Sequence, residues 1–299
     1  MPAETPVVSP RTLAEAYALL AGGAPVHRPL AGGTDLLVQL TGELGPAPER
    51  VLDLWAVDEL RGIEVDGQAL VIGALTTYTE LRRSVACRVH TPALVEAAAT
   101  IGAAQIQNRG TIGGNVMNAS PAGDTLPVLL ALDAVLVVGG AAGERQVAAS
   151  DFWPAYRRTA AREDELLLRV RIPLEEGRSQ RFRKVGTRRA QAISKVVMAA
   201  AWREDEGGAW RDVRVAFGSV AATPIRVPAV EQALEGRQPD DAAISSALGA
   251  LAGAIAPIDD VRSTAAYRKE VAGRILRRML LDARPPRNGA GGADSAEPA

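Results

Sequence analysis

The order of strand and helix patterns along the chain changes near residue 177. Before this point, short apolar strand patterns alternate with short helix patterns, and glycine, proline or a capping residue separates them. After it come three strand patterns and then three helix patterns, at 181–186, 193–202, 213–220, 227–235, 240–255 and 264–281. Because strand runs followed by helix runs are typical of α+β domains, the sequence predicts an α+β domain with a three-stranded antiparallel sheet at about 177–283. The Gly-, Ala- and Pro-rich tail at 284–299 predicts disorder.

The composition excludes several classes of protein. The 299 residues include 34 basic and 35 acidic side chains, so the charge balance gives no indication of a nucleic-acid partner. No apolar run approaches the roughly 20 residues of a membrane span. The N-terminal residues lack the pattern of a secretory signal, which favours a cytoplasmic location. One cysteine, Cys87, and two histidines, His27 and His90, are too few for an iron–sulfur cluster or another protein-bound transition metal.

Two glycine pairs have neighbours suited to binding an anion. The first lies in 31–35 (AGGTD), between a strand pattern at 25–30 and a helix pattern from Leu36, and the second lies in 111–115 (TIGGN). Glycine allows positive φ and leaves room for an incoming group, and consecutive backbone N–H groups in such turns form an anion site. The pattern therefore indicates a pyrophosphate held between two turns. Ordinary tight turns are the alternative, since neither pair matches G-x-G-x-x-G or G-x-x-x-x-G-K-[ST].

Five longer stretches, in their order and spacing, resemble one protein family. They are LAGGTDLL (30–37), TIGGNVMNASPAGDTLP (111–127), DELLLRVRIP (164–173), FRKVGTRRAQAISKV (182–196) and SVAATPIRVPAVEQAL (219–234). Together they resemble the FAD-binding subunit or domain of the molybdenum hydroxylases, a group that includes xanthine dehydrogenase and carbon monoxide dehydrogenase. The resemblance covers about residues 5–283. It implies a bipartite FAD-binding domain of two small α/β lobes, 1–58 and 59–176, ahead of the C-terminal domain.

The resemblance also implies which residues hold the cofactor, FAD. In the family, the two glycine segments enclose the pyrophosphate and the adenosine side of FAD. The corresponding positions in the first segment are Leu30, Ala31, Gly32, Gly33, Thr34, Asp35, Leu36 and Leu37. Those in the second segment are Thr111, Ile112, Gly113, Gly114 and Asn115.

Four further positions carry over from the family. Asp124 matches an aspartate near the ribityl and adenosine part of FAD, although it is equally suited to cap the helix that follows Gly123. Leu167 matches an apolar residue whose backbone faces the flavin. Ile101 matches an apolar or aromatic residue against the flavin ring, and helix core is its alternative. Lys184 matches a lysine close to the isoalloxazine, where a cation would stabilise the reduced flavin, and a solvated strand lysine is its alternative.

The function that the resemblance implies is that of an electron-transfer flavoprotein subunit, an oxidoreductase component without a catalytic acid or base. A small partner subunit would carry [2Fe–2S] clusters, and a large one would carry the molybdopterin centre that oxidises the substrate, in a dimer of heterotrimers. Electrons would pass from a cluster to FAD and then to an external acceptor. Two alternatives stay open: a free-standing FAD-dependent oxidoreductase of the same fold, and a nucleotide-binding module without redox function.

Two departures from the family narrow this function. Some relatives in the benzoyl-CoA reductase branch insert a segment with cysteines for another iron–sulfur cluster, and a chain whose only cysteine is Cys87 does not fit that branch. In xanthine dehydrogenases the stretch after the pair Arg188-Arg189 is acidic, whereas here it reads Ala190-Gln191-Ala192. This makes NAD a doubtful acceptor and leaves a quinone, a cytochrome and oxygen open.

Overall fold

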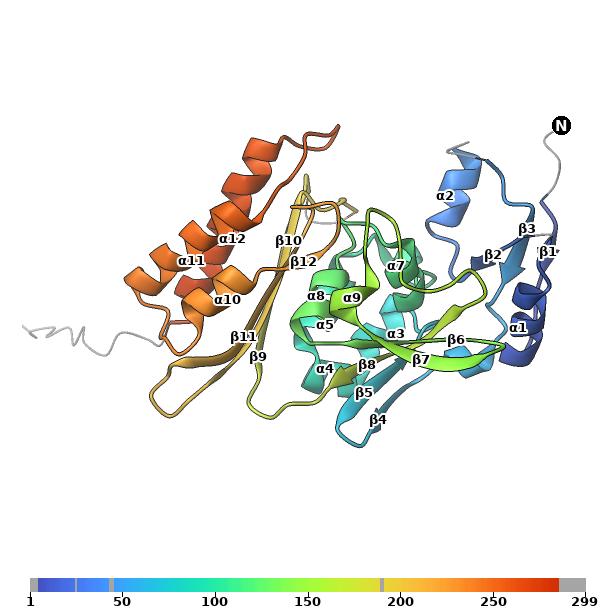
Figure 1. Ribbon diagram of the computed structural model, residues 1–299, viewed down its shortest axis with the longest axis horizontal. Helices are drawn as coiled ribbons and strands as arrows, with labels where there is room; N and C mark the ends of the chain where they lie inside the picture. The colour runs from blue at the N-terminus through green and yellow to red at the C-terminus, as the bar shows by residue number, and fades with distance from the viewer. Residues whose placement is uncertain (1–4, 25, 43–45, 189–190, 285–299) are drawn as a thin grey trace, which may run out of the picture.

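The computed structural model describes residues 5–24, 26–42, 46–188 and 191–284. Three sheets follow one another along its longest axis, and three helices cover the outer side of the last sheet (Figure 1). The predicted fold class is confirmed, because two small lobes with their own sheets precede an α+β unit formed by the C-terminal residues. The predicted disorder of the tail concerns residues that, beyond Arg284, lie outside the described ranges, as do Arg189 and Ala190.

The first lobe is a three-stranded parallel sheet with the strand order β1-β3-β2. Its elements are β1 (Val7–Val8), α1 (Leu13–Ala21), β2 (His27–Leu30), α2 (Leu36–Thr41) and β3 (Arg50–Asp53). Ala16 of α1 and Leu52 of β3 are fully buried, and they share a core with Val137 and Leu168 of the second lobe. The two lobes are therefore held together by common apolar packing.

The second lobe is built on a five-stranded antiparallel sheet with the order β4-β5-β8-β6-β7. Its strands are β4 (Ile63–Asp66), β5 (Ala69–Gly73), β6 (Val135–Gly140), β7 (Gly143–Ala148) and β8 (Leu166–Pro173). Its helices are η1 (Asp58–Leu60), α3 (Tyr78–Arg83), α4 (Val85–His90), α5 (Pro92–Thr100), α6 (Ala104–Gln107), α7 (Ile112–Asn118), α8 (Leu126–Ala131) and α9 (Ala149–Phe152). On β6, Leu136 and Val138 join the core with the helices, whereas Val137 joins the core shared with the first lobe. Strand alternation thus places the sheet between the helices and the first lobe.

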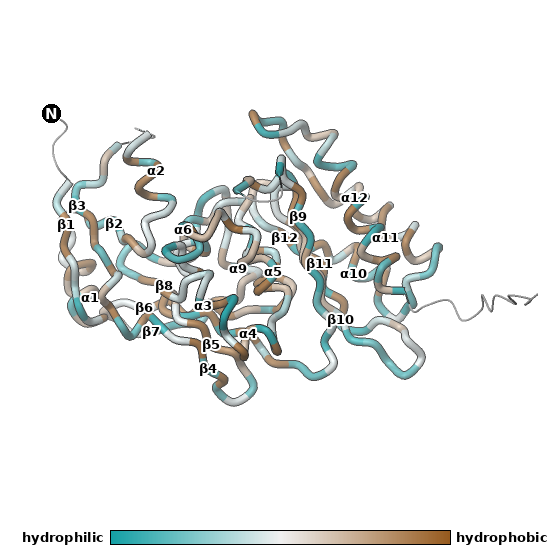
Figure 2. The backbone as a smooth tube through the Cα atoms, turned by 180° about the vertical axis from the view of Figure 1, so that it is seen from behind, coloured by the Kyte–Doolittle hydropathy of each residue, from teal (hydrophilic) through white to brown (hydrophobic). Residues whose placement is uncertain are grey.

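The C-terminal unit contains the three predicted strands, β9 (Ser179–Val185), β10 (Val196–Glu204) and β11 (Trp210–Gly218), and a two-residue edge strand, β12 (Ile225–Arg226). Its helices are α10 (Pro228–Leu234), α11 (Asp241–Ala254) and α12 (Ala265–Asp282). On β10, Val197 and Ala199 face the core of the second lobe, whereas Met198 and Trp202 face these helices. Burial on both faces explains the unbroken apolar run of β10 (Figure 2). Among the described residues, no helix has the length and apolar character to cross a bilayer.

The sequence predicts that the second glycine pair lies in a turn, and this prediction is wrong. Residues 112–118 form the helix α7, which begins after Thr111, and the Thr111 side chain accepts a hydrogen bond from the Gly114 N–H. Glycine is a poor helix former, but Gly113 packs directly on the backbone of Ala74 and is fully enclosed. Tertiary packing therefore overrides the low helix propensity of the glycine pair.

Candidate functional site

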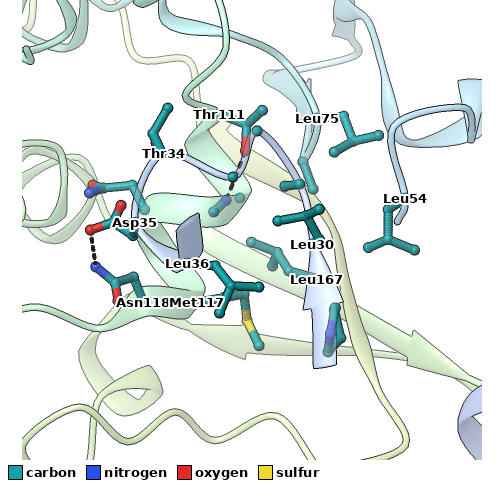
Figure 3. Close-up of a pocket in the computed structure, with 18 of the residues that line it drawn as sticks. Leu30, Thr34, Asp35, Leu36, Leu54, Leu75, Thr111, Met117, Asn118 and Leu167 are labelled. Atoms are coloured by element: carbon teal, nitrogen blue, oxygen red, sulfur yellow. Dashed lines mark hydrogen bonds between the residues drawn. The ribbon is translucent and has the colours of Figure 1, made fainter. Parts of the chain in front are cut away.

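A cleft lies between the first lobe and the second lobe, and both glycine segments line it (Figure 3). It encloses about 1030 Å³ of empty space, including the part open to solvent. Twelve of the predicted cofactor residues line the cleft: Leu30, Ala31, Gly32, Gly33, Thr34, Asp35, Leu36, Thr111, Gly113, Gly114, Asn115 and Leu167. Segments 80 residues apart in the sequence thus meet at one site, as the binding of one pyrophosphate between two glycine segments requires.

The first glycine segment, residues 31–35, is an open loop between β2 and α2. Within the described chain, no acceptor receives a hydrogen bond from the backbone N–H groups of these five residues. Gly33 has a φ of 77°, a conformation that favours glycine. A Cβ atom at Gly32 would lie 1.7 Å from the carbonyl oxygen of Arg109, so the loop approaches this backbone as closely as only glycine allows. The two glycines therefore set the shape of a loop whose donors are available to an anion.

The second glycine segment is the first turn of α7, and its backbone donors are used within the protein. The N–H groups of Ile112, Gly113, Gly114 and Asn115 donate to Thr76 O, Ala74 O, Thr111 Oγ1 and Thr111 O at 3.0, 2.9, 3.0 and 3.1 Å. A Cβ atom at Gly113 would lie 2.6 Å from the Ala74 carbonyl oxygen, so this glycine serves packing. A Cβ atom at Gly114 would lie 3.0 Å from Thr111 Oγ1 and 3.8 Å from the Ala31 Cβ, so Gly114 lies beside both its helix cap and the first segment. The expected N–H cradle is therefore absent from residues 112–115, where the glycines provide space.

A hydrogen bond joins the two segments at the polar end of the cleft. The Asn118 Nδ2 group, at the end of α7, donates to Asp35 Oδ1 at 3.1 Å (Figure 3). Asn118 Oδ1 accepts from Arg157 Nη1 at 3.0 Å. Burial raises the pKa of the Asp35 carboxyl above its ordinary value, while Arg157 and the Asn118 hydrogen bond act in the opposite direction. Asp35 is thus held in place as an acceptor beside the open loop.

The opposite end of the cleft is apolar. Figure 3 shows Leu54 and Leu75 on the side away from Asp35 and Asn118, and Leu60 lines the same cavity. Of the described residues that line the cleft, Arg28 is the one cation. A ligand that carries a flat apolar ring on one side and an anionic group near the glycine loop matches this polarity.

Asp124 and Lys184 lie outside the cleft lining and form a buried ion pair at the junction with the C-terminal unit. Lys184 Nζ donates to Asp124 Oδ2 at 2.5 Å and to the Thr100 carbonyl oxygen at 3.1 Å. The Ser194 hydroxyl donates to the other Asp124 oxygen. Burial raises the pKa of Asp124, and the neighbouring Lys184 charge opposes that rise. Both alternative readings are wrong: Asp124 caps no helix, and Lys184 has a side chain only 10% exposed.

The remaining predicted residues have separate positions. Ile101 directly follows Thr100, so it lies at the same junction as Lys184. Leu37 is 53% exposed on α2, and Ile112 is fully buried in the core of the second lobe. The junction and the cleft are adjacent, because the Thr125 hydroxyl, next to Asp124, donates to Asn115 Oδ1 at 2.6 Å.

Sequence reasoning missed several residues that line the cleft. Met117 and Asn118 lie in the same stretch as the second glycine pair, and their helical position places them one turn beyond Gly113 and Gly114. Recognition of this stretch as a helix would have found them. Tyr78 lines the cleft from the first turn of α3, and no motif in the sequence marks it.

Comparisons with known proteins agree with this geometry. A family model described as the FAD binding domain in molybdopterin dehydrogenase matches residues 3–175, which is more than half of the chain. A second model, the CO dehydrogenase flavoprotein C-terminal domain, matches residues 181–283. This chain belongs to the FAD-binding flavoprotein family of the molybdopterin dehydrogenases. Members of this flavoprotein family are FAD-binding oxidoreductase subunits of the molybdenum hydroxylase type, and the predicted family and cofactor are confirmed.

Named relatives of this flavoprotein match it along most of their length. The glyceraldehyde dehydrogenase medium chain of Sulfolobus acidocaldarius is 32% identical over 271 residues, covering 90% of this chain and 95% of that protein. The putative xanthine dehydrogenase FAD-binding subunit of Escherichia coli K12 is 32% identical over 277 residues, covering 91% and 93%. A solved chain of carbon monoxide dehydrogenase from Hydrogenophaga pseudoflava is 31% identical and superposes with a TM-score of 0.89, covering 95% and 98%.

The residues of the cleft fit FAD. Glycines bring the backbone close where a Cβ would interfere, the N–H groups of residues 31–35 are without partners in the described chain, and the apolar end accepts a ring. FAD has a pyrophosphate and an adenine that match these features in kind. The described residues contain no cluster of three or more His, Cys, Asp or Glu side chains suited to a metal ion.

Proposed function

We propose that this flavoprotein is the electron-transfer subunit of a molybdenum hydroxylase-type complex. It takes electrons from [2Fe–2S] clusters of a small partner subunit and passes them to an external acceptor. The observation that carries the proposal is the cleft between the lobes, where an open glycine loop with donors unpaired in the described chain faces Gly114 of α7. FAD, when bound, exchanges one or two electrons and so connects one-electron clusters to a two-electron acceptor.

The cleft residues have distinct tasks in this proposal. The backbone N–H groups of residues 31–35 hold the pyrophosphate, and Leu54 and Leu75 receive the adenine ring. Ile101, Leu167 and Lys184 serve the flavin end, with Asp124 fixing the position of Lys184 through the 2.5 Å ion pair. No side chain of the site acts as a catalytic acid or base.

The proposal includes partners, domains and an acceptor. The relatives' names, which describe medium chains and FAD subunits, support a small [2Fe–2S] subunit and a large molybdopterin subunit as partners. The family resemblance extends this proposal to a cytoplasmic dimer of heterotrimers. Lobes at 1–58 and 59–176 bind FAD, and the domain at 177–283 contacts the partners. For the acceptor, the replacement of an acidic stretch by Gln191 and Ala192 puts NAD in doubt and leaves a quinone, a cytochrome and oxygen open.

The first test is an absorption spectrum of the purified chain reconstituted with FAD, recorded before and after addition of dithionite. The proposal predicts a bound flavin band that bleaches on reduction. Affinity purification from the native host should then recover two partners of unequal size, one of them with iron–sulfur absorption. Substrate turnover by the isolated chain would instead favour a free-standing oxidoreductase. Nucleotide binding without a reducible flavin band would contradict the redox role.

A further inference from the structure

Tyr78 is a buried phenol in the wall of the FAD cleft, and its hydroxyl makes no hydrogen bond to any described residue. The residue is 3% exposed and lines the cleft with both glycine segments. The Tyr78 hydroxyl is not among the buried, unpaired side-chain atoms of the described residues, so the hydroxyl stays accessible while the rest of the residue is buried. Because Tyr78 lines the cleft, this accessible hydroxyl is suited to donate a hydrogen bond to a ligand there.

The backbone around Tyr78 is fixed against the segment that leads into α7. The Tyr78 N–H donates to the Gly110 carbonyl oxygen at 3.1 Å, and Thr77 pairs with Thr111 in an isolated antiparallel bridge. The Thr77 side chain also starts α3 through a capping box with Glu80. Tyr78 is consequently a rigid residue, so its side chain needs little ordering when a ligand binds.

The ring of Tyr78 packs against Gly110. A Cβ atom at Gly110 would lie 2.9 Å from Tyr78 Cε2, so the absence of a side chain at position 110 makes room for the ring. The neighbouring residue Arg109 has its carbonyl oxygen against Gly32. The backbone at 109–110 therefore contacts both the first glycine loop and the Tyr78 ring, and Tyr78 and the loop line the same cleft.

The Tyr78 phenol is protonated at neutral pH, and its surroundings keep it so. Burial raises the pKa of Tyr78 well above its ordinary value, and the nearby carboxylates Asp35 and Asp124 raise it further. The phenol thus keeps its proton and offers it to an acceptor. The cleft needs such donors, because Arg28 is the one cation among the described lining residues and a pyrophosphate carries two negative charges.

We propose that the Tyr78 hydroxyl is a ligand of the FAD pyrophosphate, completing the donor set of the open loop at residues 31–35. This inference rests on the proposed function of the cleft. It adds a side-chain donor from outside the two glycine segments. The hydroxyl donates its proton in a hydrogen bond to a phosphate oxygen, while the backbone N–H groups of the loop bind the same group.

The test compares the full chain with Tyr78→Phe and with Tyr267→Phe, a control in which the altered tyrosine is 39% exposed on α12. Flavin fluorescence titration measures the dissociation constant for FAD, and competition measures that for ADP. We expect Tyr78→Phe to weaken FAD and ADP by the same factor, about 10- to 100-fold, as for loss of a hydrogen bond to a charged group. Tyr267→Phe should change neither constant.

Melting temperatures distinguish loss of a ligand contact from damage to the fold. Phenylalanine keeps the ring that packs on Gly110, so ligand-free Tyr78→Phe should melt within about 2 °C of the wild type. Its stabilisation by saturating FAD should be smaller than that of the wild type. Equal FAD affinity in the two proteins overturns the role of Tyr78 alone, and loss of FAD affinity without loss of ADP affinity overturns the pyrophosphate contact. Failure of the wild type to bind FAD overturns the proposed function itself.

Discussion

The two glycine segments line the same cleft but use glycine for different purposes. In residues 31–35, glycine shapes an open loop whose backbone donors have no partner in the described chain. At the start of α7, all the backbone donors of residues 112–115 are paired, and Gly113 and Gly114 leave room for the Ala74 backbone and for the cleft. Two similar glycine pairs thus provide backbone donors at one wall of the cleft and room for neighbouring groups at the other wall.

The segments also differ in support. The second is connected to the C-terminal unit through Asn115, which bonds Thr125, and through Asp124, which pairs with Lys184. The first is held by β2, by hydrogen bonds from α2 to the Gly33 and Asp35 carbonyl oxygens, and by the Asp35–Asn118 hydrogen bond. We therefore expect the second segment to act as a fixed wall, and the first as the part that a ligand orders.

The largest effect is expected from loss of the Lys184–Asp124 ion pair, which supports the second glycine segment. Lys184→Met leaves the Asp124 carboxylate buried without its counter-charge and should cost about 3–5 kcal/mol of stability at pH 7–8. Burial already raises the pKa of Asp124, and loss of Lys184 raises it further. The loss of stability relative to the wild type should thus be absent in acid, where Asp124 is protonated in both folded proteins. It should grow as the pH rises through the pKa of Asp124 in the folded wild type.

Thermal unfolding between pH 4 and pH 8 measures this dependence on the ligand-free proteins. The double variant Lys184→Met/Asp124→Asn is the matched control, since it removes both charges and should recover most of the loss at neutral pH. A deficit of equal size at pH 4 and pH 8 would show that packing, and not the charge pair, supports this wall.

The next effect tests the open loop. Gly32→Ala places a Cβ atom 1.7 Å from the Arg109 carbonyl oxygen, so residues 31–35 must move away from their donor positions. We expect FAD affinity to fall about 100-fold, measured by fluorescence titration. Gly249→Ala is the control, because a Cβ atom at this exposed position of α11 meets nothing within 4 Å. Unchanged affinity in Gly32→Ala would mean that the loop is not the principal donor.

A smaller effect is expected at the space-providing wall. In Gly114→Val the new side chain occupies the cleft towards Ala31, and its Cβ atom would lie 3.0 Å from Thr111 Oγ1, the acceptor of the Gly114 N–H, so the Thr111 side chain must shift slightly. FAD affinity should fall about tenfold, and the melting temperature of the ligand-free protein should change little, because the higher helix propensity of valine offsets the crowding at Thr111. Gly249→Val serves as the control. A large drop in melting temperature would contradict the assignment of Gly114 to space rather than fold.

The smallest effect concerns the bond that joins the two segments. Asn118→Ala removes the donor to Asp35 Oδ1 and should weaken FAD about fivefold by letting the open loop move. Asn108→Ala is a suitable control, because Asn108 bonds Thr79 outside the cleft. If both variants bind FAD as the wild type does, the loop holds its shape without the second segment.

Much of the fold follows from local patterns. The strands β8, β10 and β11 have clear apolar patterns, the Asp66-Gly67 turn identifies its hairpin, and α12 shows a helical apolar stripe over 18 residues. The small elements were harder to predict. The helix α7 contains two glycines, and β7 has only partly buried and exposed residues, so neither carries a strong local signal.

Part of the site could also be predicted from the sequence. Glycine pairs with hydroxyl and amide neighbours mark both walls of the cleft, and twelve of the predicted residues line it. Tyr78 could not be found in this way, because its value as a donor depends on a missing partner and on the room left by Gly110. The pairing of Lys184 with Asp124 joins residues 60 positions apart and likewise has no local signature.

The sequence by itself determined the order of the elements, the two glycine pairs and the family to which the chain belongs, since these depend on residue type and spacing along the chain. Only the tertiary structure decided which backbone donors are free. The N–H groups of Ile112 and Gly113 in α7 donate to the Thr76 and Ala74 carbonyl oxygens, so they are not available to a ligand. The N–H groups of residues 31–35 have no acceptor among the described residues and are available in the cleft. A donor is available to a ligand only when no closer acceptor satisfies it, and that depends on neighbours that folding brings together.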